Sequence, residues 1–194
     1  GPNFYWSVAG TSSNIPGGKE LTFNASDNLT LFKTGTPIST PASTTQTPAF
    51  TTTLYQGNGS SQVVTSGINN ESGKSLVWIK DRTSNSNHIL VDTVRGKGNY
   101  LVSNESLDNE YNLGTVKAFT GTGFTVGNQN TTNESGDNFV AWNFRAAPGF
   151  MDIVTYQGSG SSAQVINHDL GNTPGMIIIK NIDSSQNWAV YHKD

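Results

Sequence analysis

Two stretches of this 194-residue chain repeat one another at a separation of about one hundred residues. Three blocks match in the same order, the first at an offset of 101 residues and the other two at an offset of 100. The matching pairs are Tyr55–Ser61 with Tyr156–Ser162, Leu76–Lys80 with Met176–Lys180, and Asn87–Val91 with Asn187–Tyr191. Blocks that keep both their order and their spacing do not arise by chance. The chain therefore carries a duplicated structural unit.

The composition favours strands over helices. Hydrophobic residues make up 34% of the chain and charged residues 13%. The remaining residues are mostly Gly, Ser, Thr and Asn, which favour turns and strand surfaces. A soluble helical protein would need more Ala, Leu, Glu and Lys. Because the net charge is only −3, the chain also lacks the high charge typical of disordered segments. We predict an all-β fold.

The complete copy of the repeat, residues 50–149, consists of short strand-like runs. Leu76–Ile79 is a four-residue apolar run, which is typical of a strand with both faces covered. Phe139–Phe144 places its even-numbered apolar side chains on one face, and we expect Trp78 and Trp142, which lie in these runs, to belong to the core. About seven or eight strands with turns every ~8–12 residues are the pattern of an antiparallel β-sandwich or jelly roll.

The other residues divide into segments of different character. Gly1-Pro2 has the form of a scar left by tag cleavage, residues 3–34 hold strand-like runs, and residues 35–49 form a Pro/Ser/Thr-rich linker. The runs are Phe4–Trp6, Leu21–Phe23 and Leu29–Phe32. Residues 150–194 are the first part of a second repeat. We expect this part to expose apolar edges unless the strands of residues 3–34 or a neighbouring chain cover them.

Several segments in both copies resemble a known family. They are Tyr156–Gly160, His168–Gly171, Pro174, Met176–Lys180, Trp188–His192, His88–Gly96, Asn133–Gly136 and Phe139–Phe144. They resemble a repeat domain of unassigned function found in predicted tail-fibre and receptor-binding proteins of marine bacteriophages. The resemblance covers about residues 50–194. The family is similar in pattern to sandwiches of the concanavalin or LamG type.

The resemblance implies an extracellular domain of a virion tail fibre, homotrimeric, that binds a glycan on the host cell surface. The first copy departs from the pattern, because Ile68–Glu71 stands where the second copy has His168–Gly171, and Pro174 has no counterpart. We therefore expect the two copies to have different roles.

No residue pattern in the sequence indicates catalysis. The three histidines, His88, His168 and His192, do not fall at equivalent positions of the two copies, so the repeat does not bring them together. The segments Gly57–Ser60 and Gly158–Ser161 lack the Lys and the following helix of a phosphate-binding loop, so they are interpreted as turns. We expect neither an enzyme nor a bound cofactor.

An acidic loop at residues 103–112 leaves other interpretations open. Its carboxylates Glu105, Asp108 and Glu110 could bind Ca²⁺ through oxygen ligands, or a pair of them could hydrolyse a polysaccharide. Their spacing is not that of an EF-hand. A solvated loop is the simpler interpretation, and we predict no metal site and no catalytic site.

Charge and hydropathy also limit the partners. The 11 Lys and Arg residues are scattered, and a nucleic-acid-binding protein would need a basic patch. No apolar stretch approaches the ~18 residues of a membrane-spanning helix. We expect no nucleic-acid partner and no membrane insertion.

One tryptophan lies in a polar setting that suits carbohydrate binding. Trp188 follows Asn187 and is close to Tyr191 and His192 in the sequence. Sugars present an apolar C–H face with polar edges, so an aromatic ring beside hydrogen-bonding groups can bind them. We predict Trp188, Asn187, Tyr191 and His192 as carbohydrate-binding residues.

These observations favour a receptor-binding module that attaches reversibly to host glycan through several weak sites. A structural spacer without a ligand and a bacterial surface adhesin are alternatives, and a polysaccharide depolymerase ranks last.

Overall fold

The computed structural model describes residues 13–15, 19–21, 48–160 and 163–194. The chain divides into two units, Gly1–Gln46 and Thr47–Asp194, and each is described by itself. In the first unit, β1 (Ser13–Ile15) and β2 (Lys19–Leu21) form an antiparallel pair.

Several sequence predictions fall on residues outside this description. They concern Gly1-Pro2, the runs Phe4–Trp6 and Leu29–Phe32, residues 22 and 23 of the run Leu21–Phe23, and the linker as far as residue 47.

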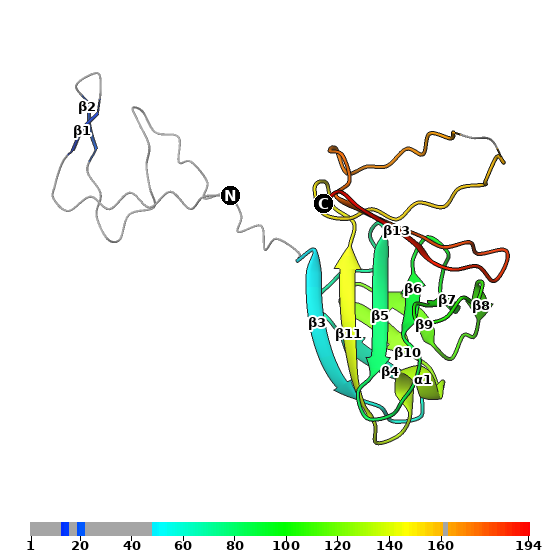
Figure 1. Cartoon of the computed structure of the whole chain (residues 1–194). Coiled ribbons are helices and arrows are strands. Elements are labelled where there is room, and N and C mark those ends of the chain that lie inside the picture. Colours follow the sequence, from blue (N-terminus) through cyan, green and yellow to red (C-terminus); the bar gives the residue numbers. More distant parts are fainter. Residues whose placement is uncertain (1–12, 16–18, 22–47, 161–162) are drawn as a thin grey trace. The chain divides into compact units, whose positions relative to one another are not determined.

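Six of the nine strands between residues 50 and 149 form one antiparallel sheet (Figure 1). In order across the sheet they are β3 (Phe50–Gln56), β11 (Asn138–Arg145), β5 (Ser75–Asp81), β6 (Ile89–Asp92), β7 (Asn99–Val102) and β8 (Glu110–Tyr111). β11 pairs with β3 on one side and with β5 on the other, along seven residue pairs each. The first and last strands of the repeat therefore lie side by side.

The other three strands form a smaller antiparallel sheet, in the order β4 (Gln62–Thr65), β10 (Gly123–Val126) and β9 (Val116–Thr120). Buried apolar side chains of both sheets form one core, with Val77, Ile79, Phe139 and Ala141 from the larger sheet and Val64, Val116, Phe124 and Val126 from the smaller. Along β5, buried and half-buried residues alternate, as expected of a strand with one face in a core. The predicted all-β antiparallel sandwich is confirmed.

One short helix, α1 (Asn130–Asn133), follows β10. In the part of the chain that the structure describes, no helix has the length and apolarity to cross a bilayer.

Trp78 and Trp142 do not lie in the core. Val77 on β5 and Phe139 on β11 face the smaller sheet, and the even-numbered residues of these strands point to the opposite face. The two tryptophans are half-buried there and pack edge to face, with their ring centroids 5.8 Å apart. The prediction was wrong because both faces of β11 are rich in apolar residues, so residue size did not identify the core face.

The core face of β11 includes a polar residue, Asn143, which is fully buried. Its Oδ1 accepts hydrogen bonds from Ser66 Oγ at 2.7 Å and from Asn70 Nδ2 at 2.9 Å. Its Nδ2 donates to Asn70 Oδ1 at 3.0 Å and to the carbonyl oxygen of Leu76 at 3.1 Å. Burial of this side chain is tolerated because its polar atoms have partners.

The second copy reproduces the central hairpin of the first. β12 (Met176–Ile179) pairs with β13 (Ala189–His192), and each of its four residue pairs lies 100 residues after a pair of the β5–β6 hairpin. A backbone hydrogen bond beyond the ladder also recurs at this spacing. It runs from Thr93 N to Ser75 O at 3.0 Å and from Lys193 N to Gly175 O at 2.9 Å. The duplication is therefore structural in this segment.

The turn that follows each of these strands repeats as well. Asp81 and Asn181 occupy equivalent positions, and Oδ1 of each accepts backbone N–H bonds from the residues two and three positions later, at 2.8–3.1 Å. The amide of Asn181 thus replaces the carboxylate of Asp81 without changing the turn.

The two hairpins differ in burial. Val77 and Ile79 are fully buried, whereas every apolar side chain of β12 is 39–53% exposed. Residues 150–157, which are equivalent to β3 in sequence, form no strand. The second copy therefore contains the hairpin of the repeat, but the apolar side chains of β12 are not buried as those of β5 are.

Candidate functional site

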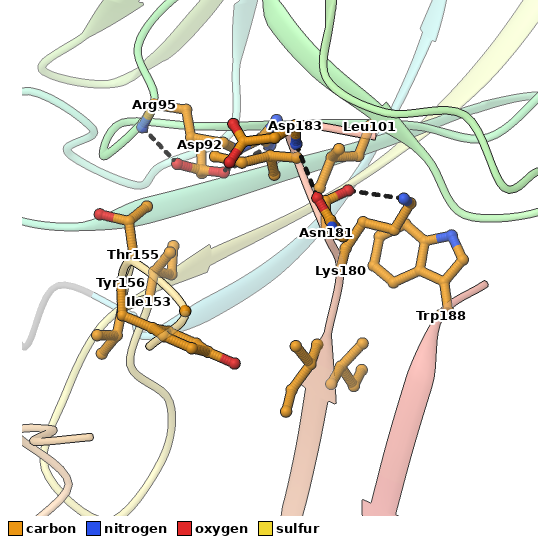
Figure 2. A pocket seen from close by; sticks show the side chains of 15 residues that line it. Asp92, Arg95, Leu101, Ile153, Thr155, Tyr156, Lys180, Asn181, Asp183 and Trp188 are labelled. Atoms are coloured by element: carbon orange, nitrogen blue, oxygen red, sulfur yellow. Dashed lines mark hydrogen bonds and ion pairs between the residues drawn. The ribbon is translucent and has the colours of Figure 1, made fainter. Parts of the chain in front are cut away.

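A cavity of about 320 Å³ lies between the first copy and the C-terminal segment (Figure 2). The first copy contributes Asp92, Arg95 and Leu101, and the second contributes Ile153–Tyr156, Gly158, Ile178–Asp183 and Trp188. Figure 2 shows Tyr156 and Trp188 on opposite sides of this space. The cavity combines two aromatic side chains with several charged and amide groups.

The first copy contributes a buried ion pair to the polar part of the cavity wall. Arg95 Nη2 lies 2.6 Å from Asp92 Oδ2, and the two side chains are only 8% and 6% exposed. Asp92 Oδ1 accepts the backbone N–H groups of Val94 and Arg95 at 3.0 and 2.8 Å. The guanidinium of Arg95 also donates to Asn109 Oδ1 at 2.8 Å and to the carbonyl oxygen of Leu90 at 3.2 Å. These charge-assisted bonds hold the wall in one conformation.

Trp188 attaches the second hairpin to the first copy. Its side chain is half-buried, and its indole N–H donates to the carbonyl oxygen of Glu105 at 2.9 Å and to that of Val102 at 3.2 Å. The equivalent residue of the first copy is His88, which instead accepts a hydrogen bond from Trp78 on β5 of its own hairpin at 2.9 Å. The substitution of Trp for His thus coincides with a contact that only the second copy makes.

The other three predicted carbohydrate-binding residues lie outside the cavity. Asn187, Tyr191 and His192 are exposed, and none of them lines the cavity. Tyr191 and His192 are neighbours on β13, so their side chains point to opposite faces of the hairpin. The structure brings Trp188 to the cavity and does not bring the other three residues to it.

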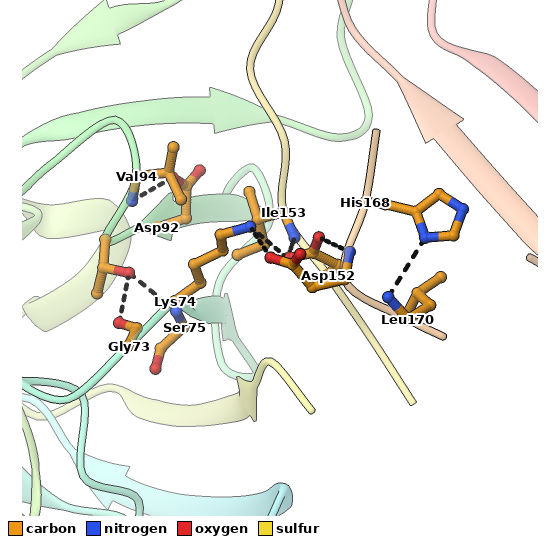
Figure 3. Close-up of polar contacts among 11 residues, drawn as sticks. Gly73, Lys74, Ser75, Asp92, Val94, Asp152, Ile153, His168 and Leu170 are labelled. Carbon is orange, nitrogen blue, oxygen red and sulfur yellow. Dashed lines mark hydrogen bonds and ion pairs between the residues drawn. The ribbon is translucent and has the colours of Figure 1, made fainter. Parts of the chain in front are cut away.

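A second polar contact joins the copies at the start of the C-terminal segment (Figure 3). Lys74 Nζ lies 2.7 Å from Asp152 Oδ1 and 3.3 Å from Asp169 Oδ2, and the Asp152 side chain is only 4% exposed. The backbone N–H of Asp169 donates to Asp152 Oδ2 at 2.9 Å. Asp152 thus joins Lys74 of the first copy to Asp169 of the second.

This contact shifts the pKa values of both charged groups. Burial opposes ionisation of Asp152, but the hydrogen bonds from Lys74, Asp169 and Ile153 outweigh it, so its pKa lies below the ordinary value. The hydrogen bond to Asp152 raises the pKa of Lys74. Both groups are therefore held in their charged forms.

Sequence reasoning did not select Tyr156, Asp92 or Arg95 as site residues. Each lies in a segment that carries the family resemblance, Tyr156–Gly160 or His88–Gly96. The resemblance therefore drew attention to these segments, but it did not indicate that residues about sixty positions apart would line one cavity.

No metal site is found among the residues that the structure describes, because no group of three or more His, Cys, Asp or Glu side chains comes together there. In the acidic loop, Glu105 is exposed, while Asp108 and Glu110 are half-buried. This loop contacts the second copy through two backbone groups: the carbonyl oxygen of Glu105 accepts the indole N–H of Trp188 at 2.9 Å, and the N–H of Asn109 donates to the carbonyl oxygen of Ile182 at 3.3 Å.

The fold and the cavity define an all-β repeat module in which the cavity lies between successive copies. Residues 45–194 match the model of a domain of unknown function, DUF7483, and the chain belongs to this family. No curated protein and no solved structure matches the chain.

Proposed function

We propose that this chain is a saccharide-binding attachment module of a virion tail fibre, and that the saccharide binds in the cavity between the two copies. The observation that carries the proposal is the placement of Tyr156 and Trp188 on opposite sides of a cavity whose wall includes the Asp92–Arg95 ion pair.

The chemistry of the cavity suits a sugar ring. Aromatic rings can pack against the apolar C–H faces of a sugar, and nearby carboxylate, amide and ammonium groups can bond to its hydroxyls. Lys180, Asn181 and Asp183 supply such groups. At about 320 Å³, the cavity is at the small end of ligand pockets, which span about 300–1,000 Å³. A site of this size fits one or two sugar rings.

The fibre context rests on the resemblance of segments such as Met176–Lys180 and Trp188–His192 to repeats of marine phage fibres. In a homotrimeric fibre outside the cell, each chain would present one such cavity to the host surface glycan. Weak individual sites then add up through effective concentration, so each site can release readily while the virion stays attached.

The proposed role is binding without catalysis. Asp92 is ion-paired with Arg95, and Lys180 Nζ donates to the carbonyl oxygen of Asn181 at 2.7 Å. A glycosidase needs one carboxyl group that donates a proton and a second that attacks or activates water. Asp183 is an exposed carboxylate of the wall, and with Asp92 engaged it has no partner of this kind in the cavity.

A glycan array followed by isothermal titration tests the proposal. The full chain, fluorescently labelled, should bind a defined set of glycans. Tyr156→Ala should then weaken binding of the selected glycan about tenfold, which corresponds to about 1.4 kcal/mol. Tyr191→Ala is the matched control, because Tyr191 is similarly exposed and lies outside the cavity. Absence of binding to any glycan, or equal loss in both variants, would contradict the proposal.

A structural spacer without a ligand is the second candidate. It is favoured by contacts that fix the second copy on the first, among them the Lys74–Asp152 ion pair, the Trp188 hydrogen bonds and the hydrogen bond from Asn109 N to Ile182 O. A spacer predicts that no glycan binds and that breaking these contacts changes only stability and geometry, whereas the attachment module predicts a loss of glycan binding as well.

A further inference from the structure

Aliphatic side chains form much of the wall of the cavity between the two copies. Among the residues that the structure describes, six line it (Figure 2), namely Leu101, Ile153, Val154, Ile178, Ile179 and Ile182. Four of the six, Val154 and the three isoleucines of residues 178–182, are 37–53% exposed. These side chains can therefore bury further apolar area against a ligand, which is favourable.

Several polar groups of the wall are already bonded within the protein. Besides the Asp92–Arg95 pair, Asn181 Oδ1 accepts the backbone N–H groups of Asp183 and Ser184 at 2.9 and 3.1 Å. Asn181 and Asp183 are exposed, so sugar hydroxyls can bond to side chains of the turn at residues 180–183. A hydroxyl directed at the aliphatic wall would lose its bonds to water without replacement.

The charges of the wall cancel. In the described part of the chain, the charged residues that line the cavity are Asp92, Arg95, Lys180 and Asp183, two of each sign. Asp92 and Arg95 neutralise one another across 2.6 Å, which leaves Lys180 and Asp183 as a further group of each sign. A wall of this kind does not favour a carboxylate or an ammonium group on the ligand.

We infer that the saccharide bound in this cavity is a neutral sugar that carries a methyl group, as a 6-deoxy sugar or an N-acetyl sugar does. The inference rests on the proposed function. The methyl group packs against the aliphatic wall, while hydroxyls on the opposite edge of the ring bond to the turn at residues 180–183. A single apolar group in a fitted pocket changes affinity by about 10–200-fold, so the methyl group determines which sugars bind.

Sugars that differ at a single position test the inference on the full chain. The pairs are L-fucose with L-galactose, L-rhamnose with L-mannose, and N-acetylglucosamine with glucose, each carried on the same linker. In at least one pair, the methyl-bearing member should bind about tenfold more tightly than its hydroxylated partner. The pair that shows this preference distinguishes a 6-deoxy sugar from an N-acetyl sugar. Glucuronate on the same linker should bind no more tightly than glucose.

A matched pair of variants locates the methyl group. Ile178 and Met176 are each 53% exposed on β12, and their side chains point to the same face of the strand, but of the two only Ile178 lines the cavity. Ile178→Thr should reduce the preference for the methyl-bearing sugar about threefold to fourfold, the equivalent of one buried methylene. Met176→Thr should leave the preference unchanged.

The possible failures of this experiment are distinguishable. Equal affinities within every pair, tighter binding of the hydroxylated sugars or of glucuronate, or an equal loss of preference in both variants would overturn the inference. The proposed function would stand in each of these cases, because a saccharide still binds. Failure of every sugar to bind would instead contradict the proposed function, and the inference with it.

Discussion

The indole nitrogen of Trp188 lies 2.9 Å from the carbonyl oxygen of Glu105, which is 83 residues earlier in the chain. Together with the ion pair between Lys74 and Asp152, this contact positions the second copy against the first. The cavity lies between the two copies, so its shape depends on these contacts as well as on the residues that line it.

Loss of the indole N–H should loosen the second hairpin. Trp188→Phe keeps an aromatic ring but removes the donor to Glu105 and Val102, which is worth about 1 kcal/mol for a typical hydrogen bond. Hydrogen exchange measured by mass spectrometry should show faster exchange in residues 176–192, with little change in β5 and β11. Tyr191→Phe serves as the control, because Tyr191 is exposed. Unchanged exchange in Trp188→Phe would show that the contact does not hold the hairpin.

The Lys74–Asp152 contact should persist only between acid and alkaline limits. The pKa of Asp152 lies below its ordinary value of 3.8, so the carboxylate's contribution is present above pH 3.8 and is lost as the pH falls through the folded-state pKa. The pKa of Lys74 lies above its ordinary value of 10.5, so its contribution is present below pH 10.5 and is lost as the pH rises through the folded-state pKa.

The amide signal of Ile153 reports on this contact, because its N–H donates to Asp152 Oδ1 at 2.8 Å and its own side chain does not titrate. Its chemical shift should be constant near neutral pH and should change in acid with a midpoint below 3.8. In Asp152→Asn this acid transition should be lost. A midpoint above 3.8 would contradict the assignment.

Protonation of His88 should destabilise the first copy. Burial, with a smaller contribution from Lys80, lowers the pKa of His88 below 6.5, and its Nδ1 accepts the indole N–H of Trp78. The unfolded chain therefore binds a proton more readily than the folded one. Stability should decrease as the pH falls from 6.5 towards the folded-state pKa.

Thermal unfolding at pH 7.5 and pH 5.5 measures this effect. The wild type should lose more stability between these conditions than His88→Gln, in which residue 88 does not titrate. An equal loss in both proteins would assign the pH dependence to other groups.

Equivalent glycines of the two copies should respond differently to substitution. A Cβ on Gly57 would overlap the carbonyl oxygen of Glu134 and lie 2.8 Å from the Phe139 ring, whereas a Cβ on Gly158 would meet nothing within 4 Å. Gly57→Ala should cost about 1–3 kcal/mol of unfolding free energy, as overpacking does. Gly158→Ala should be close to neutral. Denaturant unfolding compares the two, and equal costs would show that the second copy is packed as tightly as the first.

Much of the fold could be predicted because strand patterns are local. The all-β class and the hairpins of both copies follow from short apolar runs between turns, and the offset of 100 residues persists in the strand register. The core face of β11 could not be predicted. Its larger aromatic residue, Trp142, lies on the outer face, and the polar Asn143 lies in the core. Asn143 can be buried there because Asn70 and Ser66, which are distant in sequence, donate hydrogen bonds to it.

The candidate site was harder to predict for a related reason. Trp188 was selected because its sequence neighbours are polar, yet the cavity joins it to Tyr156, Asp92 and Arg95, which lie far from it along the chain. Sequence proximity suggested Asn187, Tyr191 and His192 instead. The difference between Trp188 and its counterpart His88 was the more direct indication that Trp188 makes a contact specific to the second copy.

Mapping a bound saccharide by NMR tests the central claim most directly. The full chain, labelled with ¹⁵N, would be titrated with the glycan selected on the array. We predict that the shifts cluster on Gly158, on residues 180–183 and on the indole N–H of Trp188, and that they saturate together. Shifts centred on the outer-face pair Trp78 and Trp142, or no shifts at millimolar saccharide, would contradict binding in the cavity between the copies.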